Sequence, residues 1–400
     1  MLTMHPTLLV GPYDWDPERI PKEEFTDRIQ AFWDDISDTE CSAAIVYGDS
    51  RHHAELMYLS HFVPKLGPAF LLVPREGGPT LLVSGAPNML PAARRMTWIE
   101  QIQPLRDAGK DIVQWLEESY GSGAAMSQPP AALIGGEYIR SANYRSLTEA
   151  FAPENPFVDA TAPLRRLMRY KRPRELILIR DGCSILKAAT QALAEAKESG
   201  ASLIEAILQA ERVAYQMSAQ DVRTLFSLDG GRTLRPFEAP IADRVDPLQA
   251  YIAVRHAGYW AEGFVLLADL PDLIMMKASA ALKAVIKVAT AGTSYANLAR
   301  VVAEISGSYQ EHPMTRGNMG NGIGLSLEEE PRLVAGSEDA LDVGSVYTLR
   351  VGVSDGEGHH AIMSAMVVVN QRGNKVLWSA TEATRAKQKK KTEQHERTKF

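Results

Sequence analysis

The sequence predicts an α+β protein of two domains, the second of which is an internal duplication. Two glycine-containing break points, at residues 200–202 and 292–294, lie 92 residues apart, and each ends one long helical pattern and begins another. Short apolar runs typical of β-hairpins follow each pair of helices. A repeated helix–helix–hairpin unit is the economical explanation of this order. We expect the two halves to join their sheets in one curved layer, with the helices outside and a cleft inside.

A smaller α/β domain is predicted over residues 1–160. Turn residues at 75–78 separate two apolar strands in the pattern of a hairpin. Apolar spacing predicts a helix over residues 107–118. Two prolines within residues 151–156 indicate a connection between the domains. The predicted strands of this domain cover residues 42–47, 69–73, 80–83 and 131–134.

The second domain is expected over residues 161–383. Pro173 suits the first turn of a helix, and Ser202 with Glu205 forms a capping box that opens the next helix. The predicted helices cover residues 173–198, 202 onward, 273–289 and 293–305. The predicted strands cover residues 222–228, 250–255, 259–267, 346–353 and 361–369.

Composition and charge argue against several classes of protein. The chain has 400 residues, of which 45% are hydrophobic, and it contains no apolar run long enough for a membrane span. A net charge of −6 argues against nucleic acid as the main ligand. Residues 384–400 are basic, nearly free of apolar side chains and expected to be disordered. Two cysteines cannot form a disulfide framework and no signal peptide is evident, so we expect a cytoplasmic protein.

Residues 320–331, GNGIGLSLEEEP, resemble the GHGIGLxxHExP signature of the creatinase, prolidase and aminopeptidase P superfamily, peptidase family M24. The resemblance extends over about residues 30–380. It implies the pita-bread catalytic fold, which matches the duplication above, preceded by a creatinase-type N-terminal domain. Three further segments agree with family motifs in the same order, at residues 164–175, 258–262 and 346–352.

The metal site that the resemblance implies is not reproduced in this sequence. Metallopeptidases of the superfamily hold two divalent metals with two Asp, one His and two Glu. The corresponding positions fall at Tyr251, Glu262, Asn321, Arg350 and about Ser364. Two divalent cations need several anionic oxygens, and Arg350 adds positive charge, so we expect no metal and no other cofactor. Four histidines could in principle rebuild a metal site: His256, His312, His359 and His360. They lack the spacing of a metal-binding motif.

Two functions stay open. The resemblance to creatinase and ectoine hydrolase implies a metal-independent hydrolase that cleaves a C–N bond in a small polar molecule. An amidine, ureido or cyclic amide group in a molecule that also bears a carboxylate would suit the positive charge of Arg350. The alternative is a catalytically inactive, metallopeptidase-like scaffold for binding or regulation. The lost ligands became polar or charged, which favours the enzyme because unpaired buried polar groups are costly.

Two carboxylates are the candidate catalytic residues. Glu262 could be a general base, a covalent nucleophile, or only the partner of Arg350 in an ion pair. Glu328, at the family's second histidine position, could be a general acid or part of a solvated acidic loop. Arg350 could bind the substrate carboxylate with two parallel hydrogen bonds. Asn321 could donate to an oxyanion or be a satisfied core amide.

Further substrate contacts are expected around these groups. Tyr259 and Trp260 could form walls for a small ligand, and Arg235 lies near the family's conserved-histidine loop. In creatinase, the N-terminal domain of one subunit closes the active site of the other. The resemblance therefore implies a homodimer, with a lid that includes His61 and Phe62.

Overall fold

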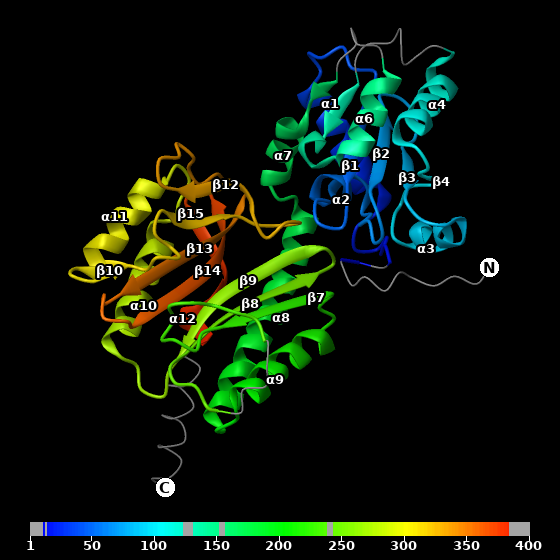
Figure 1. The fold of residues 1–400 in the computed structure, drawn as a ribbon. Coiled ribbons are helices and arrows are strands. Elements are labelled where there is room, and N and C mark those ends of the chain that lie inside the picture. Colours follow the sequence, from blue (N-terminus) through cyan, green and yellow to red (C-terminus); the bar gives the residue numbers. More distant parts are fainter. Residues whose placement is uncertain (1–10, 13, 123–130, 152–156, 238–242, 384–400) are drawn as a thin grey trace. The chain divides into compact units, whose positions relative to one another are not determined.

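The structure is a computed structural model that describes residues 11–12, 14–122, 131–151, 157–237 and 243–383. It divides into two compact units, Met1–Met168 and Arg169–Phe400, whose elements are labelled in Figure 1. Both units combine helices with sheets, so the predicted α+β class is confirmed. Residues 152–156 of the predicted connection at 151–156, and the predicted tail at residues 384–400, lie outside the described residues.

A mixed six-stranded sheet forms the centre of the first unit, in the order β4-β3-β2-β1-β5-β6. Two neighbouring pairs, β1 with β2 and β2 with β3, are antiparallel, and the other three are parallel. β1 and β2 are buried along their whole length, as expected of strands covered on both faces. The strands are β1 Ala43–Gly48, β2 Ala69–Pro74, β3 Thr80–Val83, β4 Gln101–Pro104, β5 Ala132–Ile134 and β6 Val158–Asp159.

Helices pack on both faces of this sheet. α4 and α6 cover one face through an apolar cluster that includes Ile45 and Trp115. A Cβ at Gly48 would lie 3.0 Å from Leu56 of α2, so α2 covers the opposite face, because side chains alternate along a strand. The α-helices are α1 Lys22–Asp35, α2 Ala54–Ser60, α3 Leu90–Arg95, α4 Ala108–Tyr120, α6 Ser141–Ala150 and α7 Thr161–Arg169.

The second unit repeats one arrangement twice, as the sequence predicts. In each half, two helices joined at a glycine precede a sheet, and a capping box opens the second helix of each pair. Figure 1 shows α8 and α9 beside β7–β9, and α10 and α11 beside the larger sheet. The helices are α8 Pro173–Glu198, α9 Leu203–Gln216, α10 Leu273–Val288, α11 Tyr295–Ser306 and the short α12 Ala380–Ala383.

Two sheets of the second unit meet between β9 and β14. Side chains of β14 hold this junction, since Ser364 Oγ accepts from the Phe264 amide at 2.8 Å and Met366 Sδ lies 3.3 Å from the Glu262 amide. The smaller sheet runs β7-β8-β9, with β7 Asp221–Phe226, β8 Leu248–His256 and β9 Tyr259–Leu267. The larger sheet runs β12-β11-β13-β14-β15, with β10 paired to β13. Its strands are β10 Gln310–Glu311, β11 Asn318–Gly322, β12 Glu329–Val334, β13 Val346–Ser354, β14 His360–Asn370 and β15 Gly373–Ser379.

Glycines allow β11 to lie between its two neighbours. Gly320 has a φ of 144°, and a Cβ there would overlap the carbonyl oxygen of Thr348 on β13. A Cβ at Gly322 would lie 2.6 Å from the carbonyl oxygen of Glu330 on the other side. The glycine-rich motif therefore permits close backbone approach at the strand that carries Asn321.

Candidate functional site

The five positions that correspond to the family's metal ligands come from five strands of the second unit. Arg350 on β13 is the cross-strand partner of Ser364 on β14, and Asn321 on β11 is the partner of Thr348 on β13. Ser364 in turn bonds to the backbone of β9, the strand of Glu262. The duplicated fold therefore brings residues from both halves of the unit to one place.

A trio of polar side chains, Tyr251, Arg350 and the buried Glu262, forms the centre of this site. Glu262 is 3% exposed and Arg350 13% exposed, and Arg350 Nη2 donates to Glu262 Oε1 at 2.5 Å. The Tyr251 hydroxyl donates to Glu262 Oε2 at 2.5 Å. Burial, together with the Glu262 charge, raises the pKa of Tyr251 far above its usual value. Tyr251 therefore stays protonated and acts as a hydrogen-bond donor.

Two hydrogen-bond donors at this site lack an acceptor. Arg350 Nε and Thr348 Oγ1 are buried atoms without a hydrogen-bond partner within the described part of the chain. They lie two residues apart on β13, and so on the same face of the strand. A buried donor without a partner destabilises the folded state by about 1–3 kcal/mol. The site therefore favours a ligand group that supplies acceptor oxygens.

Asn321 holds the loop that follows β11. Its Nδ2 atom donates to the carbonyl oxygen of Gly322 at 2.6 Å and to that of Leu327 at 2.9 Å. Both amide hydrogens are therefore used within the chain. Asn321 therefore has no amide hydrogen left to donate to an oxyanion. It matches the alternative that was considered, a core amide whose hydrogen bonds are satisfied.

Glu328 is exposed and is not among the partners of Glu262. Its side chain is 59% exposed and lies 3.5 Å from Arg332, which is 62% exposed. The neighbouring carboxylate, Glu329 at the start of β12, is turned inward and pairs with the buried ammonium of Lys171 at 2.6 Å. Glu328 directly precedes this strand, and its side chain is open to solvent. The geometry contradicts its expected place in the site as general acid, and the solvated acidic loop describes it.

Neither aromatic residue of the hairpin offers a free ring to a ligand. Tyr259 is buried, and its hydroxyl donates to Glu175 Oε1 at 3.1 Å, at the start of α8. The Trp260 ring has the guanidinium carbon of Arg223 at 4.6 Å and that of Arg255 at 5.4 Å from its centroid. Cation–π contacts of this kind occupy the ring. The expected ligand walls are therefore structural residues.

The remaining predicted contacts lie outside the trio. Arg235 is exposed and joins Phe226 through two backbone hydrogen bonds of 3.0 Å. His61 and Phe62 are buried within the first unit, at 4% and 2% exposure. His61 Nδ1 lies 2.9 Å from the Met96 carbonyl oxygen, and burial lowers the pKa of its imidazole to about 4. The lid expected at His61 and Phe62 is wrong, because both side chains belong to a core.

One segment of the second unit matches a known family model. The model of metallopeptidase family M24 matches residues 270–371, a range that includes Asn321, Arg350 and Ser364. Residues 270–371 are therefore similar to metallopeptidase family M24. This match confirms the resemblance that the glycine-rich motif suggested.

Several solved structures have a similar fold. The prolidase from Pyrococcus horikoshii OT3 aligns with a TM-score of 0.69 at 16% identity, over 88% of this chain and 97% of that chain. The X-Pro aminopeptidase from Thermotoga maritima MSB8 aligns with a TM-score of 0.68 at 17% identity, over the same shares of both chains. The Xaa-Pro dipeptidase from Bacillus anthracis aligns at 0.66 and 14% identity, again over 88% and 97%. A comparison with curated proteins gave no match.

These likenesses show the fold of an M24 protein over most of the chain, with a pita-bread domain preceded by an N-terminal domain. The matched M24 family is one of metallopeptidases, and the structures named are peptidases. Across the described ranges, which leave out six segments of the chain, no helix is long and apolar enough to cross a membrane.

The donor set of this site does not fit a pair of divalent metals. Glu262 is the one carboxylate at the five ligand positions, and it is already bonded to Arg350 and Tyr251. A guanidinium at the centre repels a cation. Among the residues that the structure describes, no group of three or more His, Cys, Asp or Glu could hold a metal ion. His312 Nε2, for example, lies 3.0 Å from the Gly231 carbonyl oxygen.

Sequence reasoning overlooked two residues of the site. Tyr251 was considered only as a lost ligand, and Thr348 was not considered. The hairpin turn at Ala257 and Gly258 pairs Tyr251 with Phe264, which places its side chain on the same face as Glu262. The register of that hairpin could have predicted Tyr251 as a neighbour of Glu262. Thr348 can be recognised as a site residue only from the structure, where its hydroxyl has no described partner.

Proposed function

We propose that the chain is a metal-independent hydrolase that cleaves a C–N bond in a small, polar, carboxylate-bearing molecule. The observation that carries this proposal is the pair of unpartnered donors, Thr348 Oγ1 and Arg350 Nε, beside the buried Glu262. A substrate carboxylate offers the acceptor oxygens that these two donors lack. The named M24 peptidases also act on C–N bonds, which supports the class of reaction.

Glu262 is the proposed general base. Each carboxylate oxygen has two acceptor sites, so the bonds from Arg350 and Tyr251 leave a site for a water molecule. In the proposed step, Glu262 takes a proton from water while the water oxygen bonds to the carbon of the C–N group. Glu262 then passes that proton to the leaving nitrogen as the C–N bond breaks. One carboxylate thus serves both proton transfers, and Glu328 is not needed.

A second function, a binding scaffold without catalysis, is favoured by a different observation. Both oxygens of Glu262 are already bonded within the chain, and Glu328 is exposed. In this alternative the trio is a structural substitute for the family's metals. Thr348 and Arg350 would still bind an acidic ligand, but the ligand would leave unchanged.

A thermal-shift screen followed by a turnover assay tests the proposal. The screen contains amidines, ureido acids and cyclic amides, each offered as a free carboxylate and as its uncharged methyl ester. We expect carboxylates to raise the melting temperature and the matched esters to have little effect. Products are followed by proton NMR, before and after treatment with a chelator, which should leave turnover unchanged.

Two variants separate the hydrolase from the scaffold. Glu262→Gln should still bind the compound but turn it over at least about 100-fold more slowly. Thr348→Val should raise KM about tenfold with little change in kcat, because it removes a donor to a charged group. The matched control is Thr315→Val, since the equally buried Thr315 donates to the His312 carbonyl oxygen at 3.2 Å. That control should lose stability and keep its KM.

Three outcomes would contradict the proposal. Equal shifts from carboxylates and esters would exclude the acidic ligand. Binding without turnover of any compound would favour the scaffold. A Glu262→Gln variant with normal turnover would remove the proposed base.

A reducing cytoplasmic setting and a homodimer belong to the same proposal. Cys41 and Cys183 are both buried and unpaired, which suits a compartment that keeps thiols reduced. Burial raises the pKa of the Cys183 thiol to about 12, so this thiol is unreactive. The homodimer rests on the resemblance to creatinase.

A further inference from the structure

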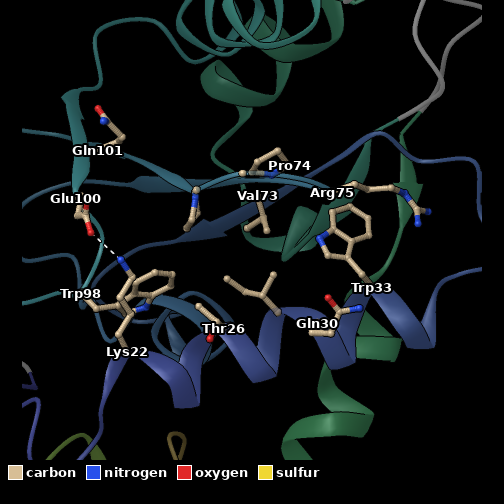
Figure 2. Close-up of a pocket in the computed structure, with 14 residues that line it drawn as sticks. Lys22, Thr26, Gln30, Trp33, Val73, Pro74, Arg75, Trp98, Glu100 and Gln101 are labelled. Atoms are coloured by element: carbon tan, nitrogen blue, oxygen red, sulfur yellow. Dashed lines mark hydrogen bonds and ion pairs between the residues drawn. The ribbon is translucent and has the colours of Figure 1, made fainter.

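The first unit contains a pocket of about 470 Å³ that is separate from the trio of the second unit. It lies between one face of α1 and the strands β2 and β4, as Figure 2 shows. Ligand pockets in proteins typically measure about 300–1,000 Å³, so this one has room for a small molecule. Its apolar lining includes Ile29, Trp33, Val73, Pro74 and Trp98.

Trp33 brings an unpartnered donor to this pocket. Its side chain is buried, and Nε1 has no hydrogen-bond partner in the portion of the chain that the structure describes. Figure 2 shows the indole nitrogen turned toward the interior of the pocket. The other three tryptophans of the first unit all donate: Trp15 to Ile20, Trp98 to Leu59 and Trp115 to Thr80. A ligand in the pocket could therefore supply a hydrogen-bond acceptor for the Trp33 indole nitrogen.

Positive charge lies beside the same indole ring. The guanidinium carbon of Arg75 is 4.8 Å from the Trp33 ring centroid, and Arg75 donates to the carbonyl oxygens of Thr39 and Cys41. Arg75 forms no ion pair with a described residue. The cation at the other end, Lys22, is paired with Glu100 at 2.6 Å. The unneutralised charge is thus at the Trp33 end of the pocket, where it favours an anion.

We propose that this pocket binds a small carboxylic acid with an elongated apolar body. The carboxylate accepts the Trp33 indole hydrogen beside Arg75, and the body extends along Ile29 and Val73 toward Trp98. Lys22 and Trp33 lie eleven residues apart on α1, which corresponds to about 16 Å along the helix. A linear or aromatic acid of medium length matches this shape. The inference is independent of the chemistry proposed for Glu262.

Octanoate is the probe for this pocket, and octylammonium, of equal chain length and opposite charge, is its control. The full chain is labelled with 5-fluorotryptophan, and the Trp33 and Trp98 resonances are assigned from the variants Trp33→Phe and Trp98→Phe. We expect octanoate to shift the Trp33 fluorine resonance saturably. The Trp115 resonance should not move, because its indole bonds to Thr80 away from the pocket. Octylammonium should give no saturable shift at Trp98 or Trp33.

Trp33→Phe removes the donor while it keeps an aromatic ring, and it should weaken octanoate binding at least about fivefold, read from the Trp98 resonance. The same variant should lose no stability through hydrogen bonding, since the lost donor had no partner in the described residues. Trp98→Phe should be less stable, because it leaves the Leu59 carbonyl oxygen without its 3.0 Å bond. Thr26→Phe, at an exposed position of the lining, should block octanoate by filling the pocket.

Several results would overturn this site. The proposed site is wrong if octanoate does not shift the Trp33 fluorine resonance, or if octylammonium shifts this resonance equally. Unchanged octanoate affinity in both Trp33→Phe and Thr26→Phe would place the probe elsewhere. Failure here leaves the hydrolase proposal intact, because the two sites share no residue.

Discussion

Removing one partner of the Arg350–Glu262 ion pair should destabilise the second unit strongly, whereas removing both should cost much less. The side chains are 13% and 3% exposed, so either partner alone would be a buried charge without a counterion. Losing one member of a buried pair typically costs about 3–5 kcal/mol, whereas apolar replacement of both is often near neutral. We expect Arg350→Met and Glu262→Met each to lose about 3 kcal/mol or more. The double variant should lose about 3 kcal/mol less than the sum of the two.

The chain provides a matched control for this double-mutant cycle. Arg332 and Glu328 form a pair of 3.5 Å at 62% and 59% exposure, and such surface pairs contribute about 0–1 kcal/mol. Both cycles are measured by urea unfolding, with circular dichroism as the signal. The free energy of unfolding is the urea midpoint multiplied by a slope common to all variants. The single variants should lower the urea midpoint of the second unit's unfolding transition. If Arg350→Met and Glu262→Met add within about 0.5 kcal/mol, Arg350 does not hold Glu262 and the proposed site is wrong.

Two further predictions concern His61 and assembly. Because burial lowers the pKa of His61 to about 4 from an ordinary 6.5, the unfolded chain binds more protons between these values. The contribution of His61 to the free energy of unfolding is therefore complete above pH 6.5 and falls by about 3 kcal/mol as the pH drops to 4. In urea unfolding, His61→Asn should reduce this dependence of the free energy on pH. An equal dependence on pH in both proteins would refute the prediction. Light scattering at micromolar protein should give twice the mass of one chain, and the mass of a single chain would exclude the homodimer.

Much of the second unit could be predicted because its signals are local. The helix predicted at residues 173–198 is α8, since a proline suits its first turn and a glycine follows its end. The strand predicted at residues 259–267 is β9, as its buried run indicates. By contrast, α1 escaped prediction. Its inner face includes Arg28, which is buried and donates to the Tyr58 carbonyl oxygen at 2.9 Å, so its apolar periodicity is weak.

The candidate site could be predicted as a set of positions but not as a set of roles. Alignment with the family motifs placed Glu262 and Arg350 together, and their ion pair had been considered as an alternative. Glu328 was misplaced because a one-residue difference in strand register decides which glutamate turns inward. His61 was misplaced because burial is a property of the tertiary structure, which a motif does not contain.

Unpartnered buried donors link the two proposals physically. Trp33 Nε1 in the first unit, and Thr348 Oγ1 and Arg350 Nε in the second, are each separated from solvent without an acceptor in the described residues. At about 1–3 kcal/mol each, three such groups amount to a large part of a typical folding stability of 5–15 kcal/mol. A ligand that supplies the missing acceptor must therefore stabilise the unit that binds it. Acids that stabilise only the first unit would identify the Trp33 pocket, and acids that stabilise only the second would identify the Glu262 site. An acid that stabilises neither unit at saturating concentration would show that internal relaxation, and not a ligand, satisfies these donors.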